Sequence, residues 1–357
     1  MRPATFFLAV LPVLLLGACS GPADPFEDTD TTGGADTDIW PATAADYKLH
    51  NGTFLTTFSF PDVAHDDLCC RDFGDISRDF IKNGTNNADN ALAAMDAVLS
   101  VASNGKVDLV GPINTAIRVG RYVPLLDHVD IPSTSGNYQL AYFGGAPADG
   151  TTYDIAKTGD GEFLLGPEYF DGDSGKPKLL FGSAAVSAGT LTASEGHFEI
   201  PLPVLWGRVL LDVQRVQLTA DVAIVDGGVT LTNGEMSGFI KVDDWFKAYN
   251  QVVNEKCGCA ALTSDVYGRG PDGWEEHCLD TPQGTCADAD AVTCGVLLLS
   301  SIKDGGICKG LFNAVAAAAD LNFDDNDQTY EALSVGMRFS GVQATSTGLF
   351  SGDTDTP

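Results

Sequence analysis

The spacing of apolar residues changes along this chain from a helical period to a strand period. Between residues 87 and 103, apolar side chains recur at the three- and four-residue spacing of one helix face, which predicts a helix. Asn87 or Asp89 is placed to cap the start of this helix. A second helix is predicted over residues 113–120, and Asn51-Gly52 with the run over residues 53–60 predicts a strand or a hairpin.

From residue 121 onward, apolar and polar residues alternate with the period of a strand. The alternation is clearest from Val209 to Ile224, and it slips by one position at Gln214-Arg215, which predicts a β-bulge in a long strand. No helix-sized segment interrupts this region before Val242, so we expect an antiparallel meander with one solvent-facing side. Chain reversals are predicted at Ser187-Ala188-Gly189, Glu195-Gly196, Asp226-Gly227-Gly228 and Asn233-Gly234.

Helical periodicity returns after the meander. Asp243-Asp244 begin a predicted helix that ends at Cys257-Gly258-Cys259, and two more helices are predicted near residues 292–302 and 311–319. Strict alternation over residues 333–340 predicts a final strand. The predicted class is α+β, with an antiparallel β-meander, flanking helices and a disulfide-rich C-terminal segment.

The first eighteen residues have the features of a signal peptide. Arg2 supplies a short basic start, and residues 6–16 form an apolar run too short to span a bilayer as a mature helix. The run closes on Leu16-Gly17-Ala18-Cys19, which resembles the lipobox of bacterial lipoproteins. That resemblance implies that Cys19 becomes an acylated N-terminus, anchored by several acyl chains. Because Ser20 rather than Asp follows the cysteine, the resemblance also implies delivery to the outer membrane.

Composition divides the remaining chain into segments. After the signal peptide (1–18), residues 19–45 are rich in Thr, Asp and Gly and contain no Lys or Arg, which predicts a disordered acidic tether. Lipobox and tether together resemble outer-membrane lipoproteins of social and predatory Gram-negative bacteria. We assign residues 46–256 to a β-rich body with N-terminal helices, residues 257–350 to a cysteine-rich segment, and residues 351–357 to a disordered tail.

The charge of the chain restricts its partners. Its 49 acidic residues against 20 Lys and Arg give a formal net charge of −29. Nucleic acid is excluded as a partner because phosphate binding needs a basic surface, and docking onto anionic lipid head groups is disfavoured for the same reason. The expected membrane contact is therefore the lipid anchor. Calcium, a protein or a glycan remains compatible with this charge.

Eight of the nine cysteines lie outside the lipobox, and an even number in an exported protein predicts up to four disulfides. We expect Cys69 and Cys70 to link the N-terminal region to Cys257 or Cys259, because neighbouring cysteines commonly reach different partners. The alternatives are a vicinal bond between Cys69 and Cys70, and a zinc site that uses the Cys257 region and His277. The predicted disulfide cysteines are Cys69, Cys70, Cys257, Cys259, Cys278, Cys286, Cys294 and Cys308.

An acidic stretch near the C-terminus resembles the EF-hand calcium loop, with oxygen-bearing side chains at alternate positions and a Glu at the twelfth. Asp325 stands where that loop has its turn-forming Gly, and a strand is predicted where the second helix belongs. We therefore expect a calcium-binding helix–loop–strand connection, with a solvated acidic turn as the alternative. The predicted ligands are Asp320, Asn322, Asp324, Asn326, Asp327 and Glu331.

One short motif resembles a protease site. Gly172-Asp173-Ser174-Gly175 is similar to the segment around the nucleophile of chymotrypsin-like proteases, and His65 and Asp154 precede it in the right order. Asp154 lies too close to Ser174 in sequence for that fold, so an Asp/Gly-rich loop is the favoured interpretation. Convergence of these residues with His277 in space would indicate catalysis.

These observations predict an outer-membrane-anchored envelope lipoprotein with a non-catalytic binding or scaffolding role, stiffened by disulfides and calcium. One alternative is a secreted-type hydrolase whose site is built from loops. Another is an apolar-ligand carrier, in which the curved meander closes on the helices around a cavity.

Overall fold

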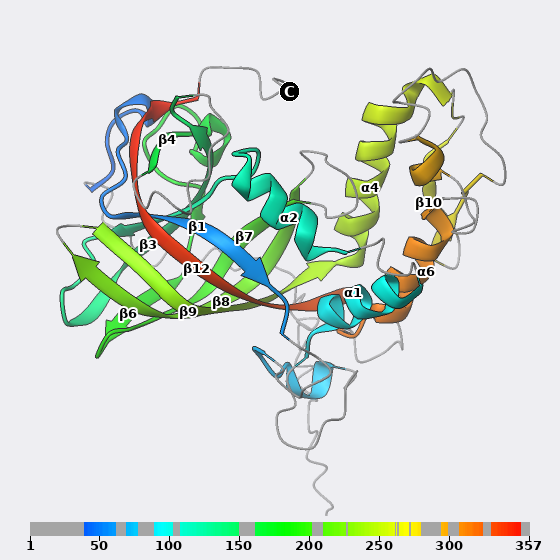
Figure 1. Cartoon of the computed structure of the whole chain (residues 1–357), viewed down its shortest axis with the longest axis horizontal. Coiled ribbons are helices and arrows are strands. Elements are labelled where there is room, and N and C mark those ends of the chain that lie inside the picture. The colour runs from blue at the N-terminus through cyan, green and yellow to red at the C-terminus, as the bar shows by residue number, and fades with distance from the viewer. Residues whose placement is uncertain are drawn as a thin grey trace, which may run out of the picture. The chain divides into compact units, whose positions relative to one another are not determined.

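The central sheet takes strands from both ends of the chain and closes on itself (Figure 1). The computed structural model describes residues 39–61, 69–77, 89–102, 108–149, 161–201, 210–225, 228–260, 262, 264–270, 273–279, 294–298, 307–323 and 330–350. The strands of the sheet are β1 (Gly52–Ser59), β2 (Pro124–Val129), β3 (Ser135–Pro147), β4 (Gly161–Leu165), β5 (Leu179–Leu180), β6 (Ser183–Ser187), β7 (Thr190–Pro201), β8 (Leu210–Val225), β9 (Gly228–Lys241) and β12 (Ala332–Leu349).

Each strand of the closed ring pairs with a neighbour on both sides. The order is β1-β2-β3-β6-β7-β8-β9-β12, and β12 returns to β1. All these pairs are antiparallel, which confirms the predicted antiparallel meander. The short strand β4 adds a parallel pairing with β12, and β5 pairs with β3. The predicted final strand thus belongs to the same sheet as the β-rich body.

Apolar side chains fill the interior of the ring. Phe58 on β1 and Phe198 on β7 are not on neighbouring strands, yet their ring centroids are 5.9 Å apart, so they meet across the interior. One layer of buried residues runs around six successive strands through direct register partners. Its members are Tyr138, Ala184, Ala193, Leu218, Met236 and Met337. Closure and interior packing remove the exposed edges and bury one face of every strand.

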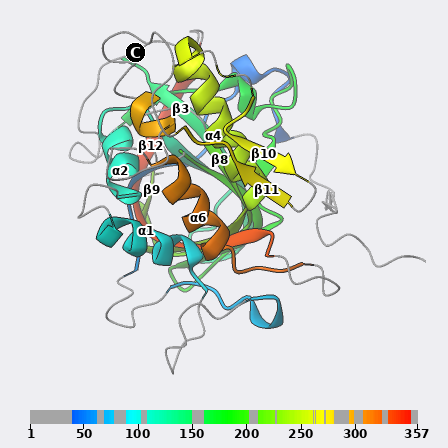
Figure 2. The same ribbon diagram turned by 90° about the vertical axis from the view of Figure 1, so that its right-hand side faces the viewer.

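The helices pack outside the ring (Figure 2). Helix α1 contacts both α6 and β12, α2 contacts β1, and α4 contacts β8 and β9. The helices are α1 (Ala91–Ala102), α2 (Val110–Arg118), α4 (Val242–Cys257) and α6 (Cys308–Ala318), with single 3-10 turns η2 (Ala44–Asp46), η4 (Gly74–Ile76), η5 (Pro167–Tyr169) and η6 (Gly258–Ala260). A separate hairpin consists of β10 (Tyr267–Gly270) and β11 (Gly273–Glu276). The predicted helices are confirmed; of the one near 292–302, residues 294–298 are described and helical.

Helix α1 is capped by a residue that the sequence analysis did not choose. Asn90 Oδ1 accepts a hydrogen bond from the Ala93 amide at 3.1 Å, which is the bond of an N-cap side chain. Asp89, one of the two predicted caps, instead accepts from the Phe73 amide at 2.7 Å. The other, Asn87, lies outside the described residues. The cap prediction was wrong for Asp89 because its carboxylate is engaged by the preceding segment.

The predicted chain reversals divide into real turns and bulges. Residues Ala188-Gly189 reverse the chain between β6 and β7 with positive φ angles, as predicted. The prediction was wrong at Glu195-Gly196 and Asn233-Gly234, which lie inside β7 and β9. Glu195 and Asn233 have positive φ and accompany register shifts, so these pairs form bulges. The bulge predicted at Gln214-Arg215 is confirmed.

Candidate functional site

Two disulfides fasten the cysteine-rich segment. Cys257 at the end of α4 bonds to Cys294, and Cys278 after β11 bonds to Cys308 at the start of α6. Their Cα–Cα distances are 5.5 and 5.8 Å, within the usual range for disulfides. Cys259 is also disulfide-bonded. Cys286 lies outside the described residues.

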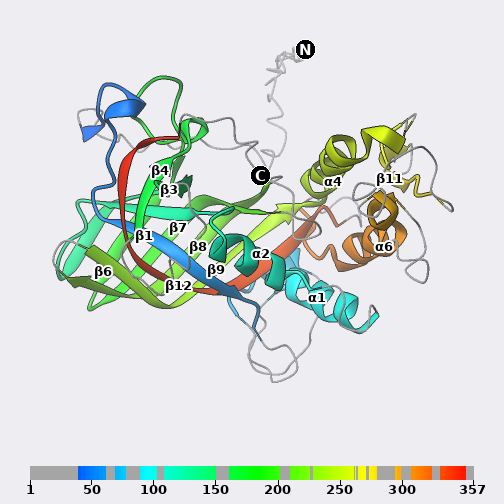
Figure 3. The same cartoon turned by 45° about the horizontal axis from the view of Figure 1, so that its top comes forward.

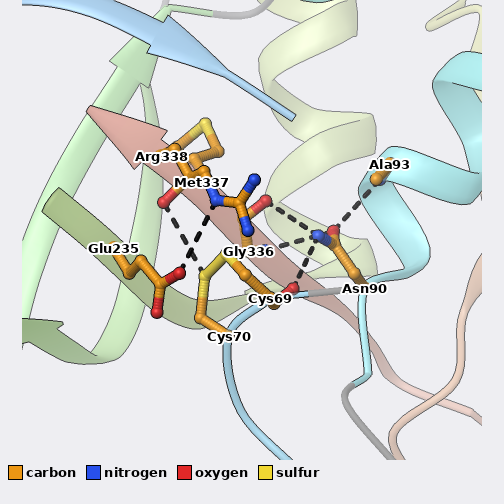
Figure 4. Close-up of a disulfide and its surroundings, with 8 residues drawn as sticks. All are labelled: Cys69, Cys70, Asn90, Ala93, Glu235, Gly336, Met337 and Arg338. Carbon is orange, nitrogen blue, oxygen red and sulfur yellow. Dashed lines mark hydrogen bonds and ion pairs between the residues drawn. A yellow bond between two sulfur atoms is a disulfide. The ribbon is translucent and has the colours of Figure 1, made fainter. Parts of the chain in front are cut away.

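Cys69 and Cys70 are bonded to each other, so the predicted link to Cys257 or Cys259 was wrong (Figure 4). The physical reason is the placement of the segment around them. It lies on the outer face of β12, where Cys70 Sγ is 3.8 Å from the Met337 carbonyl oxygen.

Asn90 fixes that segment against β12. Its Nδ2 donates to the Cys69 carbonyl at 3.1 Å and to the Gly336 carbonyl at 2.8 Å (Figure 4). Gly336 is required here because a Cβ atom at this position would lie 2.4 Å from the Cys69 carbonyl oxygen. Cys69, helix α1 and β12 therefore meet at one buried amide.

Asp127 on β2 is a fully buried carboxylate that accepts hydrogen bonds from the segment that precedes β1. Its oxygens accept from Tyr47 Oη at 2.7 Å, from the His50 amide at 2.8 Å and from the Asn51 amide at 3.1 Å. His50 Nδ1 lies 2.9 Å from the same carboxylate, and this hydrogen bond raises the pKa of His50. Burial, with the adjacent Asp127 charge, raises the pKa of Tyr47. An acceptor with this many donors anchors the segment over β2.

His128, the next residue, points to the interior of the ring. Thr53 Oγ1 donates to the Val229 carbonyl at 3.0 Å, so it accepts from His128 Nε2 at 3.1 Å. His128 Nδ1 then accepts from Tyr138 Oη at 3.0 Å, which assigns the neutral tautomer with its proton on Nε2. Burial lowers the pKa of His128 to about 4. Both ring nitrogens of His128 are therefore hydrogen-bonded, and the side chain links β2 to β1 and β3 inside the ring.

A cluster of tyrosines surrounds Glu199 on β7. Tyr169 Oη donates to the Glu199 carboxylate, and Tyr142 Oη donates to the Glu199 carbonyl at 3.2 Å. Burial raises the pKa of Glu199. Nearby, His197 Nδ1 lies 3.0 Å from Asp212 Oδ1 in a half-exposed pair between β7 and β8. The two tyrosine hydrogen bonds connect η5 and β3 to β7. The His197–Asp212 pair connects β7 to β8.

The structure describes two ends of the predicted calcium loop. Asp320 is fully buried, and its two oxygens accept from the Ser334 amide at 2.7 Å and the Ser334 hydroxyl at 2.5 Å. Burial raises the pKa of Asp320 to about 7. The Asn322 amide bonds to the Ile76 carbonyl, and the Glu331 amide bonds to the Leu321 carbonyl. The predicted ligands Asp324, Asn326 and Asp327 lie outside the described residues, so the calcium site stays a prediction.

The described part of the suspected protease motif forms a turn. Ser174 Oγ donates to the Asp171 carbonyl at 2.7 Å and accepts from the Lys176 amide, as the loop interpretation expects. His277 follows β11 in a different segment, where its amide bonds to the Val266 carbonyl. His65 and Asp154 lie outside the described residues. Within the described part of the chain, no group of three or more His, Cys, Asp or Glu is arranged to hold a metal ion.

A groove of about 540 Å³ lies on the outer face of β3, β6, β7 and β8. Its exposed walls carry the hydroxyl and amide side chains of Asn137, Ser183, Thr192 and Thr219. This surface was not predicted from the sequence, because polar residues that alternate with apolar ones are expected on the solvent-facing side of any strand. The detectable feature was the absence of charge among those polar positions.

No protein-family model, curated protein or solved structure matches the chain. Among the helices that the structure describes, none is long and apolar enough to cross a bilayer. Function has to be inferred from the residues of the chain itself.

Proposed function

We propose that this chain is an envelope lipoprotein, held to the outer membrane by acyl chains on Cys19, whose closed sheet acts as a binding or scaffolding module. The proposal assigns no chemical reaction to it. The predicted acidic tether starts at Cys19, and its last residues, 39–45, belong to the described fold, where Ala44 is buried. The acidic residues ahead of them would hold the folded body away from the membrane surface, where like charge repels it from anionic lipid.

The observation that supports a role without catalysis is the hydrogen bonding of three fully buried groups, Asp127, His128 and Asp320. Asp127, His128 and Asp320 each join separate segments of the chain through several hydrogen bonds. A catalytic acid or base needs a free face toward substrate. These groups are directed into the fold, which supports a structural role for them.

The lipid anchor is supported by sequence and by compartment. The lipobox ends at Cys19, and the disulfides between Cys257 and Cys294 and between Cys278 and Cys308 suit an oxidising environment outside the cytosol. The carrier alternative needs an apolar cavity, whereas side chains such as Leu218 and Met236 occupy the ring interior. The proposal therefore places binding on the outer surface.

The test is mass spectrometry of the mature protein, together with its distribution between membrane and soluble fractions. We expect an acylated Cys19 N-terminus in the outer-membrane fraction, resistant to high-salt washing. Cys19→Ala should move the chain to the soluble fraction, while Cys259→Ala should leave it in the membrane. A wild-type N-terminus without acyl chains, or Cys19→Ala retained in the washed membrane, contradicts the proposal.

A further inference from the structure

We propose that the groove on the outer face of β3, β6, β7 and β8 binds an uncharged oligosaccharide. This inference deepens the proposed binding function and rests on it. The strands that form the groove lie side by side in the ring (Figure 3). Its volume of about 540 Å³ falls within the range of ligand sites.

The side chains of the groove stand in register across four strands. Asn137 pairs with Ala185, Ala185 with Thr192, and Thr192 with Thr219, so one row crosses the groove from β3 to β8. In the adjacent row Ser183 pairs with Ser194 on β7. Neighbouring strands are about 4.8 Å apart, so Asn137, Thr192 and Thr219 place three hydrogen-bonding side chains along the first row, with Ala185 between the first two.

Strand pairing and a side-chain bond hold these groups in place. Ser183 Oγ and Ser194 Oγ lie 2.8 Å apart and share one hydrogen bond, which orders two hydroxyls at the wall of the groove. Ala185 places a small side chain between Asn137 and Thr192 in the first row. Hydroxyls that are already ordered lose less conformational entropy on binding.

The chemistry of the lining selects the ligand. The residues that border the groove are Asn137, Tyr138, Gly182, Ser183, Ala184, Ala185, Thr192, Ala193, Ser194, Gln217, Leu218 and Thr219. Among them, Tyr138, Ala184, Ala193 and Leu218 are buried and belong to the interior layer of the ring. None of the bordering side chains is charged, in a chain whose net charge is −29. An anionic ligand would be repelled by the surrounding protein, and a cationic ligand would find no carboxylate in the lining. An apolar ligand would leave the hydroxyls and amides without partners.

A neutral sugar chain is neither anionic, cationic nor apolar, so none of these three objections applies to it. Ser and Thr hydroxyls donate and accept, and the amides of Asn137 and Gln217 do the same, which matches the mixed donors and acceptors of sugar hydroxyls. The rows extend over several strands, so an oligosaccharide fits the groove better than a single sugar. Most of the affinity would come from hydrogen bonds at a surface open to water, and weak binding is expected.

The experiment measures binding of three neutral hexasaccharides (maltohexaose, cellohexaose and chitohexaose) to the mature, lipidated chain in detergent by isothermal titration and ligand-observed NMR. We expect at least one of them to bind with a dissociation constant between about 10⁻⁴ and 10⁻³ M, or −5.5 to −4.1 kcal/mol. Hexagalacturonate, a polyanionic hexasaccharide, is the charged control and should not bind.

Two arginine variants locate the site. Thr192→Arg places a long charged side chain in the centre of the groove and should weaken binding at least about tenfold. Thr230→Arg is the matched control, an exposed threonine on β9 outside the groove, and should leave binding unchanged. Circular dichroism confirms that both variants are folded. Thr219→Val, which keeps the shape and removes one hydroxyl, should weaken binding by a smaller factor.

Three outcomes overturn the proposal: no hexasaccharide binds at several millimolar, Thr192→Arg binds as well as wild type, or hexagalacturonate binds as tightly as the neutral chains. Acylation of Cys19 and membrane fractionation are scored on the same preparations. Failure of sugar binding with an intact anchor rejects the groove alone, and loss of the anchor rejects the proposed function.

Discussion

The phenol of Tyr47 donates a 2.7 Å hydrogen bond to the buried carboxylate of Asp127, across 80 positions of the sequence. This bond joins the start of the folded body to the second strand of the ring. His50 and Asn51 add their amides to the same carboxylate. The described chain therefore enters the sheet through a polar anchor, although the ring it joins is held mainly by apolar packing.

Asp127→Ala should be strongly destabilising. The substitution removes the acceptor of Tyr47, His50 and Asn51 at once and leaves the buried Tyr47 hydroxyl and two part-buried amides unpaired, at a cost of about 3 kcal/mol. Urea unfolding of wild type and variant measures the difference. Asp173→Ala, an exposed acid in the loop after η5, is the control and should change stability by less than about 0.5 kcal/mol. Equal stabilities for the two variants would show that Asp127 does not anchor the segment.

His128 predicts a loss of stability in acid. Burial lowers its folded pKa to about 4, below the unfolded value of about 6.5, so the unfolded chain binds a proton first as pH falls. The stability that neutral His128 provides is complete above pH ~6.5 and is lost as pH falls toward 4. Between pH 7.5 and 4.5 the loss amounts to roughly 2.5 kcal/mol.

The variant that tests this is His128→Gln, which keeps a neutral donor and acceptor between Thr53 and Tyr138. It should be less stable than wild type at pH 7.5, and the difference should shrink by roughly 2.5 kcal/mol at pH 4.5. Urea midpoints at the two pH values give the measurement. Parallel pH dependences for the two proteins would rule out titration of His128 as the cause.

Local patterns predicted the elements of this fold, but not its closure. The alternation over residues 333–340 predicted a strand, and the observed strand β12 contains these residues. Its partners β1 and β9 lie far away in sequence, and no periodicity encodes which strands meet. The Glu195-Gly196 and Asn233-Gly234 errors have a related cause, because a residue with positive φ beside a glycine serves a bulge as well as a turn.

The candidate sites were less predictable for the same reason. The sequence shows that Asp320 is acidic, and only the fold shows that Ser334 occupies both its oxygens. The Cys69–Cys70 bond likewise depends on where the segment packs, against Gly336 of β12. The groove is assembled by register between strands, so its residues carry no linear motif.

The disulfides of the C-terminal segment should each stabilise the chain. In the chain-entropy model the Cys257–Cys294 bond, with a sequence separation of 37, contributes about 3–4 kcal/mol, and Cys278–Cys308, with a separation of 30, contributes a similar amount. Double Cys→Ala variants of each pair should therefore melt at similarly reduced temperatures. Peptide mapping under non-reducing conditions checks the pairs directly, and recovery of Cys257 linked to Cys69 would refute the assignment.

Calcium should stabilise the connection between α6 and β12. Asp324 and its acidic neighbours follow Asp320 in the sequence, and an external calcium site with an affinity of about 10⁻⁴ to 10⁻³ M would add roughly 1–2 kcal/mol at 5 mM calcium. Asp324→Ala should abolish this gain. Asp320→Asn should lower stability even in the presence of chelator, because Ser334 engages both oxygens of Asp320. Melting curves with calcium and with chelator separate the two roles. A wild-type protein whose melting temperature ignores calcium would make the loop a solvated acidic turn.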